Sequence, residues 1–147
     1  MWFLYGLTVL AGVANAIQPG QNATLSKSLG QPVTAALVIL LVSTAALLVG
    51  GLALGKLELP TGQHMAQVPW WAWLGGIFSV LLILAQLYAS AAIGAASFLG
   101  IIVTVGVATS ILVDHHGWVG FPVHPASLWR ILGAVLMFAG VALVALF

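Results

Sequence analysis

Four amide side chains lie close together in the first quarter of this chain: Asn15, Gln18, Gln21 and Asn22. An amide both donates and accepts hydrogen bonds, so such a cluster is suited to holding a neutral polar solute or an anion. Asn15, Gln18 and Asn22 are spaced i, i+3 and i+7, which places them on one face of a helix. Because polar side chains inside a membrane-spanning helix usually face protein or water, we expect substrate-binding residues here.

Pro19 and Gly20 interrupt the same segment. Pro19 cannot donate to the carbonyl of Asn15, and its ring disfavours helical geometry at Gln18. We therefore predict a helix break near residues 18–20, where the helix kinks or unwinds. Secondary transporters bind substrates at interrupted helices, whose half-helix N-terminus suits an anion. The alternative interpretation is that Pro19 only marks the end of the helix, with the polar residues among lipid headgroups.

Further polar residues occur singly in later apolar stretches. Gln86 is the only large one, and Ser79 lies seven residues before it on the same helix face. A serine or threonine in such a helix more often bonds to its own backbone or to a neighbouring helix. The candidate substrate-binding residues are Asn15, Gln18, Gln21, Asn22, Ser79, Gln86 and Thr104.

Asp114 and Arg130 flank the last polar loop, and we predict that they form an entrance or gate; the alternative is that Arg130 extends to the headgroups. Gly133 and Gly140 are one heptad apart, which favours close packing of a second helix, either from another copy or within the monomer. The four histidines fit a capped, solvated loop better than a metal site, because their spacing matches no known ligand pattern. The sequence predicts no metal and no cofactor.

The composition excludes several classes of protein. Of 147 residues, 63% are hydrophobic and only 3% are charged, which cannot cover the surface of a soluble domain. A net charge of +1 excludes electrostatic binding of nucleic acid, and the absence of cysteine excludes disulfides and thiolate chemistry. No nucleophile–base pair lies in the apolar stretches, so we do not expect an enzyme.

Apolar runs of about 20 residues indicate membrane-spanning helices. We predict an all-α integral membrane protein with a single domain over residues 1–147 and five transmembrane helices. Their predicted ranges are about 2–25, with the break near 18–20, then 33–54, 69–90, 94–113 and 126–147.

The predicted topology gives almost no preference for one orientation. An odd number of spans leaves Lys56 and Arg130 on one side of the membrane and Lys27 on the other, a bias of one positive charge, 2 − 1. All six tryptophans fall on the side of Lys56, whereas aromatic belts normally line both interfaces. Two copies in opposite orientations would supply both belts. We therefore expect dual topology and an antiparallel homodimer of ten helices.

Several motifs resemble those of a known family, the YdcZ-like bacterial proteins of the drug/metabolite transporter superfamily. They are the segments 18–23 (QPGQNA), 29–36 (LGQPVTAA), 71–76 (WAWLGG), 114–117 (DHHG) and 130–133 (RILG). The resemblance implies an inner-membrane protein of five helices, related to ten-helix transporters built as inverted repeats, and it implies antiparallel pairing. It supplies no substrate. Related members often have a glutamine late in the fourth helix, and here Gly106 or Val107 stands in that neighbourhood.

Together these observations favour a secondary transporter of a small polar solute, neutral or anionic rather than cationic, because no acidic residue lies deep in a span. Its partners would be a second copy of itself, the lipid bilayer and the solute, and not nucleic acid. Two alternatives stay open: a dual-topology channel, which requires a continuous polar pore, and a non-transporting assembly partner, whose polar residues only join helices.

Overall fold

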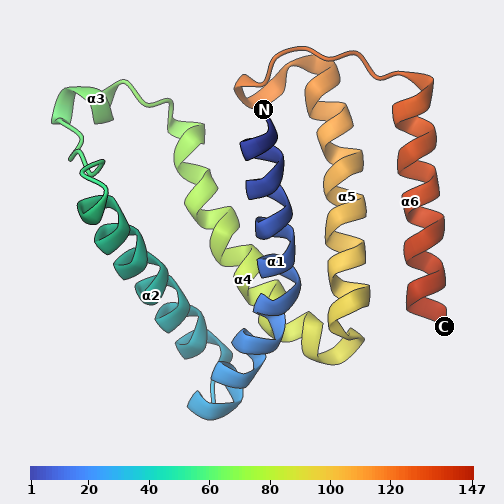
Figure 1. Ribbon diagram of the computed structural model, residues 1–147, viewed down its shortest axis with the longest axis horizontal. Helices are drawn as coiled ribbons and strands as arrows, with labels where there is room; N and C mark the ends of the chain where they lie inside the picture. The colour runs from blue at the N-terminus through green and yellow to red at the C-terminus, as the bar shows by residue number, and fades with distance from the viewer. The chain divides into compact units, whose positions relative to one another are not determined.

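A computed structural model describes all residues, 1–147, and every regular element in it is a helix. Figure 1 shows their order along the chain. The long helices are α1 (Trp2–Leu29), α2 (Pro32–Ala53), α4 (Leu74–Ile93), α5 (Ala95–His116) and α6 (Leu128–Leu146). Three short elements lie in the loops: α3 (Gly62–Ala66), η1 (Trp70–Trp73) and η2 (Trp118–Gly120).

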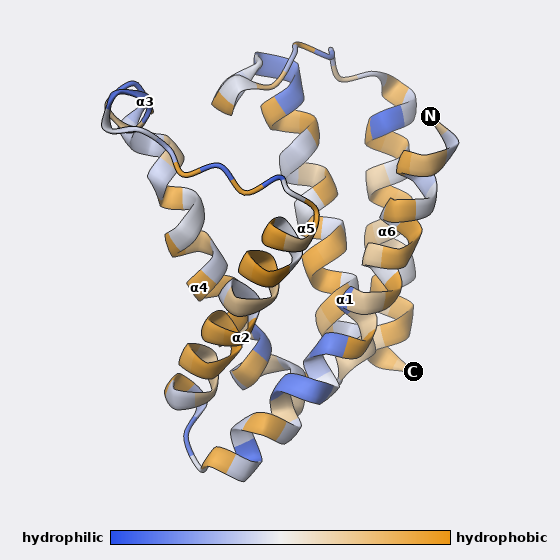
Figure 2. Cartoon of the chain, turned by 60° about the vertical axis from the view of Figure 1, so that its left-hand side comes forward, coloured by the Kyte–Doolittle hydropathy of each residue, from blue (hydrophilic) through white to orange (hydrophobic).

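Four helical stretches are long and apolar enough to cross a membrane: Pro32–Ala53, Trp70–Ile93, Ala95–His116 and Leu128–Leu146. The all-α prediction is confirmed, and these four match predicted spans to within a few residues. The fifth predicted span, α1, is not among them. It has ample length, but its clustered amides make it less apolar than the others, and Figure 2 shows this hydrophilic stretch in blue along α1.

The predicted break near residues 18–20 is not present as an unwound segment, because α1 is a single helix from Trp2 to Leu29 with Pro19 inside it. Proline removes one N–H donor, and the remaining hydrogen bonds of a long helix maintain the helical path around it. The helix also continues four residues beyond its predicted end at Leu25, and Lys27 in its last turn is favourably placed against the helix dipole.

The chain divides into two compact units, and the division passes through α1 just before Pro19. The first unit contains Met1–Ala16 and Ala92–Phe147, and the second contains Ile17–Ala91.

In the second unit, a small apolar core joins the beginning of α2 to the end of α4. Ala35, Ala36, Ile39 and Leu87 are buried there, and Leu25 of α1 packs against them. Figure 1 shows α2 and α4 converging at this end and separating toward the loop that holds α3. Alanine allows the close approach of helices in a membrane, so the contact forms where the side chains are small.

In the first unit, α5 and α6 form a hairpin whose helices run side by side (Figure 1). Gly100 makes one close contact possible, because a Cβ at this position would lie 3.0 Å from the side chain of Val141. Gly117 ends α5 in the left-handed region, with φ of 66°, and a Cβ there would lie 2.7 Å from Val123. The tight turn after α5 therefore depends on glycine.

Candidate substrate site

The most buried polar contact between helices joins α1 to α4 in the second unit. The Nδ2 of Asn22 donates to the Oε1 of Gln86 at 2.5 Å, and both residues are 6% exposed. Two residues that sequence reasoning selected independently therefore lie in direct contact. Two amides joined by one hydrogen bond still have an unused carbonyl oxygen and an unused amino group, so the pair can both donate to and accept from a solute.

The surroundings of this pair fix its position. Pro19 is buried one turn before Asn22, and Ser90 is buried one turn after Gln86. The hydroxyl of Ser90 donates to the backbone carbonyl of Gln86 at 2.5 Å. Leu87 lies next to Gln86 and belongs to the apolar core of the unit. An apolar neighbourhood strengthens a hydrogen bond and makes an unpaired amide costly, so the pair holds α1 and α4 together at a defined register.

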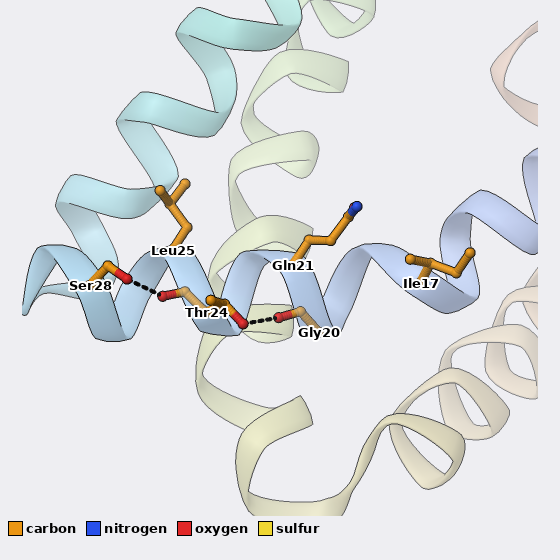
Figure 3. A pocket seen from close by; sticks show the side chains of 6 residues that line it. All are labelled: Ile17, Gly20, Gln21, Thr24, Leu25 and Ser28. Atoms are coloured by element: carbon orange, nitrogen blue, oxygen red, sulfur yellow. Dashed lines mark hydrogen bonds between the residues drawn. The ribbon is translucent and has the colours of Figure 1, made fainter.

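Three of the predicted amides lie elsewhere. Asn15 and Gln18 are exposed, although the helical spacing places them on the face of Asn22. Gln21 is exposed as well and lines a shallow groove on a different face of α1, beside Gly20, Thr24 and Ser28 (Figure 3). Thr24 donates to the carbonyl of Gly20, and Ser28 donates to that of Thr24. The amide cluster is thus divided between two faces of one helix.

The predicted hydroxyl residues behave in opposite ways. Ser79 is exposed, and its hydroxyl donates to the carbonyl of Gly75 within α4, as the back-bonding alternative anticipates. Thr104 on α5 is 1% exposed, and its Oγ1 has no hydrogen-bond partner. A buried, unsatisfied hydroxyl is destabilising, so Thr104 is an unusual feature of the α5–α6 hairpin.

Asp114 and Arg130 form an ion pair in the first unit, with a distance of 2.6 Å between the guanidinium Nη2 and the carboxylate Oδ2. Arg130 also donates through Nη1 to the backbone carbonyl of His124, whose own N–H donates to the carbonyl of Asp114. The side chains are 38% and 21% exposed for Arg130 and Asp114, respectively. The pair closes the loop between α5 and α6.

The predicted packing glycines, Gly133 and Gly140, line hollows along α5 and α6, and a Cβ at either would meet no neighbouring atom. They provide room in which another molecule could pack.

Sequence reasoning did not identify the loop contacts of the histidines. His115 Nδ1 accepts from the N–H of Ala126, and the ring of His116 stacks on Trp118 with 4.6 Å between ring centroids. Both histidines are in the last turn of α5, where a ring nitrogen can reach the backbone of the following loop. The sequence shows only that these histidines lie near the end of a helix. That position does not specify which loop group each ring contacts.

Comparison with known proteins identifies the family. The family model described as "Putative inner membrane exporter, YdcZ" matches residues 3–143. Neither the curated proteins nor the solved structures give a match. The family description, together with four helices able to span a membrane, assigns the protein to the inner membrane. Because the match extends over nearly the whole chain, this protein belongs to the YdcZ family.

Proposed function

We propose that the protein is a secondary transporter that exports a small polar solute, neutral or anionic, and that the Asn22–Gln86 pair contributes to its substrate site. The observation that carries this proposal is the buried hydrogen bond between α1 and α4. Membership of an exporter family supports transport in general. Amides in place of carboxylates favour an uncharged or negative solute, because a buried carboxylate is the usual anchor for an organic cation.

The path of the solute requires more helices than one chain provides. We propose that α1 is the fifth span and that two copies pair in opposite orientations to form ten helices with an inverted repeat. Exposed Gln21, in the groove on α1, supports this arrangement, because lipid tails cannot satisfy an amide and protein can. Alternating access would then exchange the two orientations of the site across the membrane.

A ligand screen tests the substrate site. The purified protein is heated with a panel of neutral polar solutes, namely amides, polyols and amino acids, and with carboxylate and phosphate anions. We expect at least one of them to raise the melting temperature of the wild type. Gln86→Leu should weaken that solute's binding by about 5- to 150-fold, the effect of one lost hydrogen bond.

Gln63→Leu is the matched control, because Gln63 is an exposed glutamine in α3 outside the spans. A solute that binds equally well to wild type, Gln86→Leu and Asn22→Leu would place the site elsewhere. Uptake of the bound solute into proteoliposomes, driven by its own gradient, then separates a transporter from an assembly partner, which would show none.

The chain contains no cysteine, so single cysteines report its orientation directly. We propose introducing cysteine at Gln31, between α1 and α2, and separately at Gln63 in α3. An impermeant maleimide applied to intact cells should label both positions in comparable amounts if the protein inserts both ways. Labelling of only one position would contradict the antiparallel dimer while leaving the Asn22–Gln86 site untouched.

A further inference from the structure

A groove runs along the seam between α5 and α6, and we call it the seam groove. It consists of two hollows of about 470 and 540 Å³ that share Met137. The lining residues of both hollows recur on the same face of each helix, so the hollows lie end to end along one side of the hairpin. Ser110 and Arg130 line the first hollow, and apolar residues dominate the second. The seam groove therefore has a polar end and a long apolar remainder.

The charges at the polar end oppose the helix dipoles. Asp114 lies in the last turn of α5, where the helix carries partial negative charge, and Arg130 is the third residue of α6, where it carries partial positive charge. Each charge would be better placed at the other helix end. The ion pair between Asp114 and Arg130 offsets the unfavourable interaction of each charge with its helix dipole. It does not explain why each charge lies at the unfavourable helix end.

Arg130 and Asp114 keep unused hydrogen-bonding groups that could bind a ligand with one negative and one positive group. Arg130 uses one N–H for Asp114 and one for the carbonyl of His124, and a guanidinium has five. Asp114 accepts from Arg130 through Oδ2, which leaves its Oδ1 for a ligand, and Ser110 is exposed one turn before it. The unused N–H donors of Arg130 and the N-terminus of α6 would be satisfied by an anionic group. The unused carboxylate oxygen of Asp114 and the C-terminus of α5 would be satisfied by an ammonium group. The ligand with this complementarity is zwitterionic at its head and apolar along its tail.

We propose that the seam groove binds one phospholipid with a primary-amine headgroup. Its phosphate accepts from Arg130 and Ser110, its ammonium donates to Asp114, and one acyl chain follows the apolar part of the groove past Met137. Trp118 and Trp129, both strongly exposed at this end of the hairpin, lie where tryptophan occurs at the headgroup level. Headgroups are held in this way by charged pockets between transmembrane helices.

The test is native mass spectrometry of the purified full-length protein with equal amounts of phosphatidylethanolamine, phosphatidylcholine and phosphatidylglycerol of identical chains. We expect phosphatidylethanolamine to be retained about tenfold over either competitor, because phosphatidylcholine has no N–H donor and phosphatidylglycerol has no cation. Lys56→Gln is the control, since Lys56 is an exposed cation in the loop after α2.

The decisive variant exchanges the two charges, Asp114→Arg with Arg130→Asp. It keeps an ion pair and improves its agreement with the helix dipoles. It also loses the hydrogen bond from Arg130 to the carbonyl of His124, so the thermal unfolding of the variant is measured beside its lipid retention. The preference for phosphatidylethanolamine should nevertheless fall to less than about twofold, because each headgroup charge now meets the unfavourable helix end. An unchanged preference in this variant would overturn the proposal, as would equal retention of all three lipids by the wild type.

Filling the groove provides a second test. Gly133→Leu places an apolar side chain in open space within the first hollow and should reduce retention of all three lipids. Gly75→Leu on α4, where a Cβ also meets no atom, is the matched control. If Gly133→Leu instead abolished dimerisation and left lipid retention unchanged, the groove would bind a second copy and the lipid proposal would be wrong.

Discussion

The region where α1, α2 and α4 meet and the α5–α6 hairpin both contain polar groups, but they treat them differently. The first buries two uncharged amides and pairs them with each other. The second leaves the Thr104 hydroxyl buried without a partner and places its charges in a partly exposed ion pair at the helix ends. Burial of a charge in a membrane is far costlier than burial of an amide. Polarity at depth in this protein is therefore neutral, and charge is confined to the helix ends and loops.

The largest difference between the regions should appear when Gln86 is removed. Gln86→Leu leaves the amide of Asn22 buried and unpaired, which should lower the free energy of unfolding by about 1–3 kcal/mol. Transport at solute concentrations below saturation should fall by about the same 5- to 150-fold as binding. The double variant Asn22→Leu/Gln86→Leu should recover most of the stability but none of the transport. Unfolding in sodium dodecyl sulfate measures the first effect and proteoliposome flux the second. Retained flux in the double variant would show that the pair is only structural.

Pro19 provides the next contrast, because α5 and α6 contain no proline. Pro19→Ala restores an N–H donor for the carbonyl of Asn15. Proline in a helix interior costs about 3 kcal/mol, and the two methylenes lost from the buried ring are worth about 1.6 kcal/mol, so a gain of about 1.4 kcal/mol is expected. Transport should decrease, because Pro19 is buried one turn before Asn22 and leaves the carbonyl of Asn15 without its helical donor. Normal flux in a stabilised variant would indicate that Pro19 has no functional part.

Thr104→Val should act in the opposite direction to Gln86→Leu. Valine has nearly the same shape and removes the unsatisfied hydroxyl, so the free energy of unfolding should rise by about 1 kcal/mol. Gln86 and Thr104 are both buried polar residues, but the side chain of Gln86 has a hydrogen-bond partner and that of Thr104 has none. A destabilised Thr104→Val would show that the hydroxyl has a partner after all.

Much of the fold could be predicted from the sequence because apolar runs of spanning length are a strong signal. Four predicted spans agree with helices of the structure. The helix boundary at Leu29 and the unbroken path through Pro19 were not predictable in the same way. A proline's effect depends on the hydrogen bonds around it, which a local pattern does not specify.

The candidate site was predictable only in part. The cost of burying a large amide singled out Gln86, and helical spacing placed Asn22 on one face with Asn15 and Gln18. The structure joins the first two and leaves the other two exposed, because tertiary packing and not spacing decides which part of a helix face is covered. The ion pair of Asp114 with Arg130 follows from their flanking positions, whereas the unpartnered state of Thr104 depends on a side-chain orientation that no sequence pattern contains.

The smallest effect is expected at the ion pair itself. Asp114 and Arg130 are close, but the guanidinium is 38% exposed, and pairs of this kind rarely contribute more than about 1 kcal/mol. A double-mutant cycle with Asp114→Asn and Arg130→Gln should give a coupling free energy of about 0.5 kcal/mol at low salt, decreasing toward zero in molar salt as the charges are screened. The corresponding cycle for Asn22 and Gln86 should be independent of salt, because neither group is charged. A coupling free energy at Asp114–Arg130 that does not change with salt would mean that the pair is shielded from solvent in the assembled protein. The protein would then bury charged groups as well as uncharged amides, and the comparison drawn above would be wrong.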